Sequence, residues 1–147
     1  MRHIAVVAVL ALAVAVPAQA SDVGEIKVAK GTVHVERDGK RLPASAGMPI
    51  RQSDRLVTGA DGSAGVTFTD NSLLSTGPNS VLVVDHYTFD TTTHAGKFDA
   101  SLKKGSLAVV SGKIVKQSPG AMRVRTPAAI MGVRGTDFVV QVDEPGK

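Results

Sequence analysis

The sequence predicts an all-β protein that folds as a single compact domain of short strands, arranged as a β-sandwich or jelly roll. Apolar and polar residues alternate over runs of strand length, which is the pattern of half-buried strands. Gly, Asn and Asp residues separate these runs, and no long run combines a helical apolar period with capping residues. A short β-solenoid-like roll is the alternative, because the Thr-Gly turns at Thr58 and Thr76 are similar enough to be a short internal repeat.

The N-terminal part of the domain supplies the first strands. Residues 25–30 and 32–36 alternate on either side of Gly31, where we expect a bend or a bulge. Asp38-Gly39 predicts a tight hairpin, because both residues tolerate a positive φ. Polar residues form the next connection, and residues 55–58 resume as a short strand. The apolar side chains expected on one buried face are Ile26, Val28, Val33 and Val35.

Turns recur at strand-length spacing through the rest of the chain. They separate strands expected at residues 64–69, 72–75, 81–84, 97–103, 106–110, 122–126, 128–133 and 137–142. The polar stretch from Asp85 to Ala95 predicts a long hairpin or an exposed loop. The side chains that we expect in the core are Val66, Phe68, Leu82, Val84, Leu107, Val109, Val124, Phe138 and Val140.

The N-terminus predicts a secretory signal peptide over residues 1–20. A basic start precedes the apolar run from Ile4 to Val16, and the small-residue cleavage site Ala18-Gln19-Ala20 follows it. The run is shorter than the roughly 20 residues that a spanning helix needs, and no later stretch is apolar enough to span a membrane. We therefore expect an exported, periplasmic protein with a β-domain over residues 21–143 and a disordered tail over 144–147.

The composition excludes several classes of function. The chain has 147 residues, enough for one domain, and no Cys, which excludes disulfide scaffolds, zinc–thiolate sites and lipid attachment through cysteine. Its formal net charge is +4, but Lys and Arg are scattered, so no nucleic-acid footprint is present. Aromatic residues make up only 3%, which leaves few rings on which a sugar or a base can stack.

No constellation of reactive residues predicts catalysis. A metal site requires several preorganised ligands, and the sequence places none beside His34, His86 or His94. His34 should face solvent, because it lies between two valines of a strand. The chain has no G-x-S-x-G element, and the turn residues Asp38, Asp61 and Asp70 are expected to make local hydrogen bonds. We expect no enzyme activity, no metal and no cofactor.

The segment from Thr126 to Phe138 predicts a rigid structural corner. Pro127 should end a strand, because proline cannot donate to a β-ladder. We expect Gly135 to take a backbone conformation closed to other residues, and Arg134 to hydrogen-bond inward or to pair with Asp137. The residues assigned to the corner are Thr126, Pro127, Gly132, Arg134, Gly135, Thr136 and Phe138.

Arg134 has a second interpretation as a contact for a protein partner, because arginine is favoured at interface hot spots. Tyr87 and Phe89 are the bulky residues of the polar stretch before Ala95. Loops on rigid β-scaffolds often carry recognition, so these two residues join Arg134 as candidate partner contacts. An exposed sheet edge is the other surface on which a partner could bind.

The motifs, taken in order, resemble the FecR domain family, the periplasmic part of iron-dicitrate type sensor-regulators. The segment Thr126-Pro127 through Gly132-Val133-Arg134-Gly135-Thr136-Asp137-Phe138 resembles the closing motif of the family. Residues 53–59 resemble its GD-x-I-x-T element, and the turns at residues 62–64, 70–72, 77–80 and 105 resemble further family turns. The resemblance covers roughly residues 23–142. Ser53 and Asn71 stand where the family usually has Gly, so we expect those turns to differ in backbone detail.

The resemblance implies a stand-alone periplasmic domain that acts by protein–protein contact, as sensory or regulatory input to a separate membrane signalling protein. It does not carry over the sigma-factor binding of full-length regulators, because a predicted signal peptide replaces their cytoplasmic segment and membrane helix. The alternative function is binding of cell-wall glycan or exported polysaccharide, against which the low aromatic content argues. The sequence predicts neither the identity of the partner nor the oligomeric state.

Overall fold

The computed structural model describes residues 13, 22–135 and 137–142, so the predicted signal peptide and tail lie outside the described residues. The described chain forms twelve strands and one short helix. Their bounds are β1 Asp22–Lys30, β2 Val33–Arg37, β3 Lys40–Pro43, β4 Pro49–Arg51, β5 Arg55–Thr58, β6 Ser63–Phe68, β7 Leu73–Thr76, β8 Val81–Phe89, β9 Gly96–Val110, α1 Lys113–Gln117, β10 Met122–Arg125, β11 Ile130–Val133 and β12 Asp137–Val142. The prediction of an all-β single domain is confirmed.

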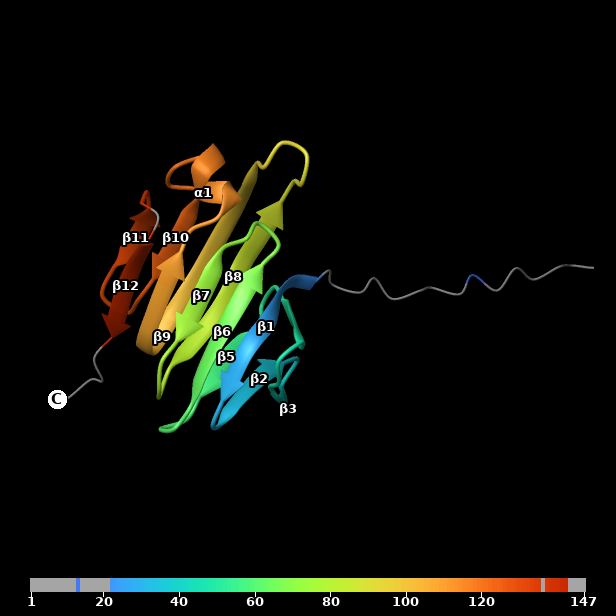
Figure 1. Cartoon of the computed structure of the whole chain (residues 1–147), viewed down its shortest axis with the longest axis vertical. Helices are drawn as coiled ribbons and strands as arrows, with labels where there is room; N and C mark the ends of the chain where they lie inside the picture. The colour runs from blue at the N-terminus through green and yellow to red at the C-terminus, as the bar shows by residue number, and fades with distance from the viewer. Residues whose placement is uncertain (1–12, 14–21, 136, 143–147) are drawn as a thin grey trace, which may run out of the picture.

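The strands form one curled sheet that folds over on itself into two layers (Figure 1). Layer 1 runs β3-β2-β5-β8-β9-β10-β11, and layer 2 runs β4-β1-β6-β7-β9-β12. All the neighbouring pairs are antiparallel except β9–β10, which is parallel. Both layers share β9, and the β1–β2 connection links them a second time.

Strand β9 belongs to both layers because it changes neighbours at Gly105. Up to Lys104 it pairs with β8, and from Gly105 onward it pairs with β12. Gly105 has a φ of +88°, and a Cβ atom at this position would overlap Ser80. The predicted strands on either side of Gly105 are therefore a single strand of 15 residues, and glycine is what lets it bend from one layer into the other.

The core lies between the layers and is centred on three aromatic rings. Phe98 from layer 1 lies 4.5 Å from Phe68 of layer 2 and 4.9 Å from Tyr87, measured between ring centroids. The Phe68 and Tyr87 rings are 5.5 Å apart. Tilted and edge-on ring pairs at these distances are favourable contacts, and they fix the two layers face to face.

The predicted core is confirmed with one exception. Phe138 is only half-buried, because it lies on β12 and no described strand continues layer 2 beyond that edge. The predicted face of the first two strands also contains one error. Val28 is exposed, since an irregularity in the register between Ile26 and Val28 turns it to the opposite side of β1.

Candidate functional site

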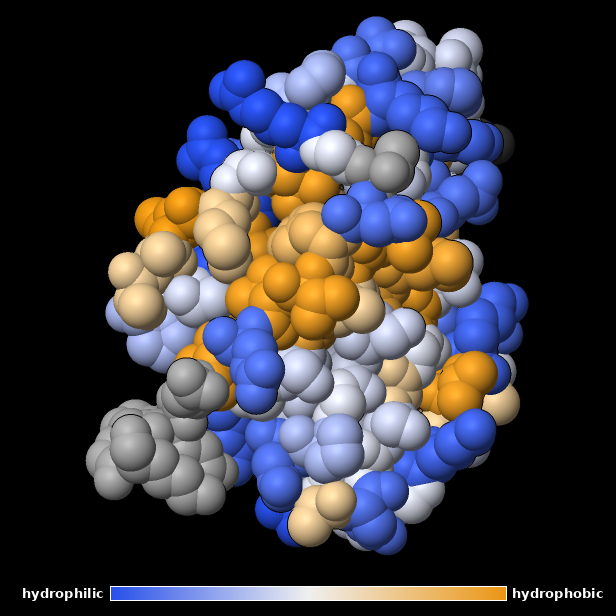
Figure 2. Space-filling view, turned by 60° about the vertical axis from the view of Figure 1, so that its left-hand side comes forward, coloured by the Kyte–Doolittle hydropathy of each residue, from blue (hydrophilic) through white to orange (hydrophobic). Residues whose placement is uncertain are grey.

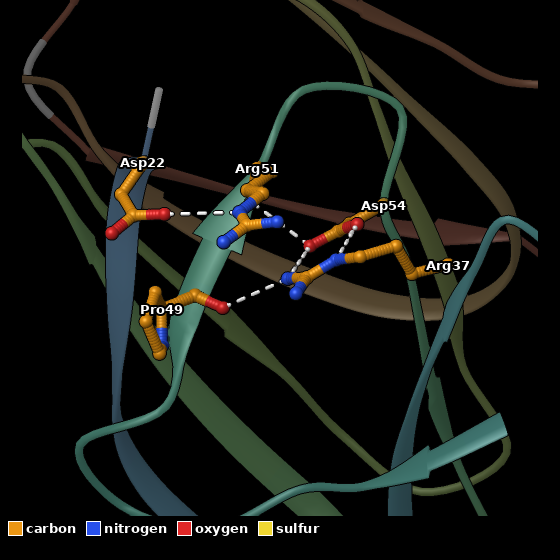
Figure 3. Close-up of polar contacts among 5 residues, drawn as sticks. All are labelled: Asp22, Arg37, Pro49, Arg51 and Asp54. Carbon is orange, nitrogen blue, oxygen red and sulfur yellow. Dashed lines mark hydrogen bonds and ion pairs between the residues drawn. The ribbon is translucent and has the colours of Figure 1, made fainter. Parts of the chain in front are cut away.

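A buried ion pair joins the N-terminal strands to the rest of the domain (Figure 3). Asp54 is 2% exposed, and its carboxylate accepts two hydrogen bonds from Arg37, at 2.8 Å from Nε and 2.6 Å from Nη2. The backbone N–H of Arg51 donates to the same carboxylate at 2.8 Å, while Arg37 Nη2 also donates to the carbonyl of Pro49 at 3.1 Å. The hydrogen bonds that Arg37 donates to Asp54 raise the pKa of Arg37 above its ordinary value.

This cluster holds strands of the domain together. Arg37 ends β2, and Asp54 sits in the turn between β4 and β5. The backbone N–H of Asp54 donates to the carbonyl of Arg51, and its carbonyl accepts from the N–H of Val84 in β8. Arg51 makes a second ion pair at the surface, with Asp22 at 3.1 Å. The two ion pairs therefore hold β1, β2, β4 and β5 together where these strands meet.

A second polar cluster surrounds Asp70, which is fully buried. Its carboxylate accepts hydrogen bonds from the backbone and hydroxyl of Ser72, at 3.1 and 2.7 Å, and from the hydroxyl of Tyr87 at 3.2 Å. It also accepts from the backbone N–H of Ile114 at 3.3 Å, in the first turn of α1. The sequence predicted only local hydrogen bonds here. The structure shows that Asp70 also connects β8 and α1 to its own turn.

The prediction that Tyr87 is an exposed contact for a partner is therefore wrong. It is 6% exposed, its ring lies in the aromatic core, and its hydroxyl accepts the Asp70 N–H at 2.9 Å. The strand β8 continues through residues that were expected in an exposed stretch, and an irregularity in register between Val84 and His86 turns Tyr87 inward. Phe89 is half-buried and stacks on His94 with ring centroids 6.0 Å apart, so its role as a partner contact stays a prediction.

Burial raises the pKa of the Tyr87 hydroxyl, and this predicts alkaline destabilisation. Because the folded state favours the neutral phenol, the resulting stability is present below the unfolded pKa of about 10 and is lost as the pH rises above it. Tyr87 is the single tyrosine of the chain and there is no tryptophan, so the ultraviolet absorbance of tyrosinate reports this residue alone. We expect Tyr87 to ionise only when the protein unfolds at alkaline pH, so tyrosinate absorbance and loss of structure should follow one transition. Titration near pH 10 with native dichroism retained would contradict this prediction.

The predicted corner begins with a tight turn that the sequence anticipated. The Thr126 hydroxyl accepts hydrogen bonds from the backbone N–H groups of Ala128 and Ala129, at 3.3 and 3.1 Å. Pro127 lies in this turn, and Arg125, the last residue of β10, pairs with Ile130 on the far side. The turn therefore follows the end of β10 at Arg125 and reverses the chain into β11, so the expected end of a strand before Pro127 is confirmed.

The second half of the corner differs from the prediction. Gly135 has no positive φ, and a Cβ atom at Gly132 or Gly135 would meet open space. Arg134 is exposed, and no ion pair with Asp137 or inward hydrogen bond of its side chain is present in the described structure. The corner crosses from layer 1 to layer 2 at the outer edge, where space is plentiful, so glycine is not required by packing. Thr136 lies outside the described residues.

The corner is instead fastened by its backbone. The hydroxyl of Ser111, just beyond the end of β9, donates to the carbonyl of Gly135 at 2.8 Å. Residues 131–135 and 137–138 border a shallow hollow of about 310 Å³, and the exposed Arg134 and part of Phe138 line it. Arg134 is thus accessible to a partner, and its role as a partner contact stays a prediction.

The outer face of layer 2 is apolar, a feature that the sequence analysis missed. Adjacent strands place Val139 opposite Ala108, Ala108 opposite Ser75, Ser75 opposite Gly65, and Gly65 opposite Val28. A second pair, Leu73 opposite Val110, lies beside this row. Figure 2 shows hydrophobic residues gathered in the middle of this side of the molecule, with hydrophilic residues around them. We call this surface the apolar face; it consists of Val28, Gly65, Leu73, Ser75, Ala108, Val110 and Val139.

The outer face of layer 1 has the opposite character. Arg123 and Arg125 alternate with buried residues along β10, and the exposed lysines of β9 lie beside them. Two cations of this face have acidic neighbours, at 3.7 Å between Lys97 and Asp99 and 3.8 Å between Arg55 and Glu36. We call this surface the basic face; it consists of Arg55, Lys97, Lys103, Arg123 and Arg125. These five cations therefore lie on the layer away from the apolar face.

The predicted histidines do not converge. His34 is half-buried rather than fully solvent-facing, and its Nε2 lies 3.4 Å from Glu36 Oε1. His86 lies in β8, whereas His94 lies in the turn that follows it. Within the ranges that the structure describes, no group of three or more His, Asp or Glu residues is arranged to hold a metal ion. No helix in the described part of the chain is long and apolar enough to cross a membrane.

The geometry defines a class of protein, a small two-layered β-domain with buried polar clusters that hold the fold and with surfaces suited to contact. The chain belongs to the FecR protein family, whose family model matches residues 54–147. The match begins at Asp54 and thus excludes β1 to β4, which the resemblance seen in the sequence had included. Comparison with curated proteins gives no match, and comparison with solved structures gives none either. The family is a regulatory and sensory family of signalling systems, and its domains are typically periplasmic.

The two residues that replace the usual family glycines keep a glycine-like backbone. Ser53 has a φ of +75° and Asn71 a φ of +69°, so both turns take the left-handed conformation. Both residues therefore take a conformation that glycine adopts readily, and the expected difference from the family turns stays a prediction. Asn visits this region readily, whereas Ser does so less easily and stores strain there.

Ser53→Gly is therefore expected to stabilise the domain, by roughly 0.5–1 kcal/mol, because glycine relieves the strain of the positive φ. Urea-induced unfolding measures this change. Gly39 also has a positive φ and faces open space, so Gly39→Ser provides the reverse control and should destabilise. A lower midpoint for Ser53→Gly than for the wild type would contradict this interpretation.

Proposed function

We propose that this protein is a non-enzymatic periplasmic regulatory domain that contacts a separate membrane signalling protein through its apolar face. The observation that carries the proposal is the apolar face itself. Val139, at 74% exposure, and Leu73, at 43%, stand with Val110 on an open sheet surface rather than in the core. Contiguous apolar patches of this kind, rimmed by polar residues, mark interaction sites.

The chemistry of the apolar face favours a protein partner over a glycan. Sugar faces stack on exposed rings, but none of the five aromatic side chains of this chain is fully exposed. Three of them form the buried ring cluster, and Phe89 and Phe138 are half-buried. The valines and the leucine of the apolar face instead offer a flat, uncharged surface against which another protein can pack. This supports the protein-contact function and leaves the polysaccharide alternative without a stacking platform.

Regulation fits the polar clusters better than catalysis does. The buried carboxylates Asp54 and Asp70 are each enclosed by donors of the domain itself and hold strands in place. A substrate would have to displace those donors to reach either carboxylate. A rigid domain with a free contact surface can instead report its presence or position to a partner, which is the task of a regulatory family.

Cross-linking in living cells tests the proposal. The wild type is expected to capture a membrane signalling protein, identified by mass spectrometry, and Leu73→Lys combined with Val110→Lys is expected to abolish that capture. These changes place two charges on the apolar face, where a desolvated partner would have to bury them. Arg125→Gln, on the basic face, is the matched control and should leave capture unchanged. Equal capture by the double variant, or retention of the protein on peptidoglycan with no protein captured, would refute the proposal.

A further inference from the structure

Strand β12 is a sheet edge that no other described strand covers. It pairs with β9 on one side and with no other strand of the described chain on its outer side. Its six residues, Asp137 to Val142, include no Lys, Arg or Pro, which are the residues that commonly guard an edge against pairing. An exposed edge of this length presents a row of backbone N–H and C=O groups that a further strand can satisfy.

The other three edges carry the protection that β12 lacks. The edge strand β3 contains two cations and ends at Pro43. The edge strand β4 has three residues, of which Pro49 is the first and Arg51 the last. The edge strand β11 has four residues, is interrupted by Gly132 and is followed by Arg134. Strand β12 is thus the edge on which an added strand meets the fewest obstacles.

We propose that β12 pairs antiparallel with β12 of a second copy of this chain, so that layer 2 continues across a two-fold axis at Val139. In this register Val139 faces Val139 of the second copy, Phe138 faces Val140, and Asp137 faces the amide of Gln141. Every side chain then meets one from the same face of the sheet. A register centred on Val140 would instead leave Asp137 beyond the end of β12 of the second copy, without the amide of Gln141 opposite it.

Charge and polarity favour the same partner. The chain carries a net positive charge, which opposes the approach of two copies through the basic face. At β12 the exposed neighbours of Val139 are Ala108 and Val110, and the strand residues that would pair between two copies include no cation. The two apolar faces then become one continuous surface across the joined sheets. A second copy therefore fits the edge in backbone, register and charge.

Cysteine cross-linking tests the register directly, because the chain has no native cysteine. Directly opposite residues of antiparallel strands have Cα atoms about 4.5–5.5 Å apart, within the roughly 4.4–6.8 Å that a disulfide spans. In the complete chain, Val139→Cys is expected to form a covalent dimer under mild oxidation. Val28→Cys lies on the apolar face but far from the edge, and it should remain monomeric. Stronger self-linking of Gln141→Cys than of Val139→Cys would overturn the proposed axis.

Sedimentation equilibrium supplies a second measurement that needs no cysteine. The wild type should show a concentration-dependent dimer, which Val139→Lys should weaken by at least about tenfold, since two ammonium groups would face each other at the axis. Val28→Lys is the matched control, and neither change should alter the unfolding midpoint, because both side chains are exposed. A monomer at every concentration, with no Val139→Cys link above the Val28→Cys level, would overturn the inference. The captured signalling partner of the proposed function would be unaffected by that result.

Discussion

Phe98→Ala is expected to lower the free energy of unfolding by about 3–5 kcal/mol, enough to unfold a large fraction of a marginally stable domain. Phe98 is fully buried, and its ring contacts both Phe68 and Tyr87 at the centre of the core. Truncation leaves a cavity between the two layers and removes two aromatic contacts together. Urea titration followed by far-ultraviolet dichroism measures the loss.

Phe138→Ala is the matched control, because it removes the same ring from the half-buried edge strand. The sequence alone placed Phe138 in the core, whereas its half-buried position on β12 reduces the expected loss to about 1–2 kcal/mol. The comparison tests the placement of the core as well as its size. Equal losses for the two variants would mean that β12 is as deeply packed as β9, which the structure contradicts.

Asp54→Ala should destabilise the domain by about 3–5 kcal/mol, because it leaves the charge of Arg37 without its buried partner. The Asp54 side chain is only 3% exposed and that of Arg37 is 18% exposed, so water replaces the lost hydrogen bonds poorly. The change also removes the acceptor for the Arg51 N–H group. Thermal unfolding of the variant and of the wild type measures the difference.

The neighbouring surface pair provides the control for this prediction. Asp22→Ala breaks the ion pair with Arg51 and should change the free energy of unfolding by less than about 1 kcal/mol. The side chains of Arg51 and Asp22 are 33% and 52% exposed, so water can replace the contact. Replacement of both partners by apolar residues, as in Arg37→Met with Asp54→Leu, should restore much of the loss, since no charge then remains buried. A loss for Asp54→Ala no larger than that for Asp22→Ala would contradict the role given to the ion pair.

The alternation of residues was enough to find the strands but not the contacts between them. Val66 and Phe68, or Leu107 and Val109, point inward because the strand period alone places them there. Val28 breaks the pattern, because a local irregularity in β1 is not encoded in residue type. The turns at Asp38-Gly39 and Pro127 were predictable because glycine and proline restrict the backbone locally.

The candidate sites depended on long-range pairing, and there sequence reasoning was weakest. Nothing local to Asp70 or Tyr87 indicates that they meet across 17 positions, so one was interpreted as a turn residue and the other as an exposed contact. The apolar face was also hidden, because it arises from single residues of five strands that become neighbours only through the register. The sequence offered one signal of the apolar face, which was the frequent Val and Ala at exposed strand positions near Val139 and Ala108.

Strand β9 sets the order in which the domain can be completed. It pairs with β7 and β8, which precede it, and with β10 and β12, which follow it. Because β12 ends at Val142, the shared strand gains its last neighbour only when nearly all of the described chain is available. Pairing between distant segments also slows folding. A chain that leaves the ribosome or a transport channel from its N-terminus would therefore remain incompletely folded until β12 has emerged.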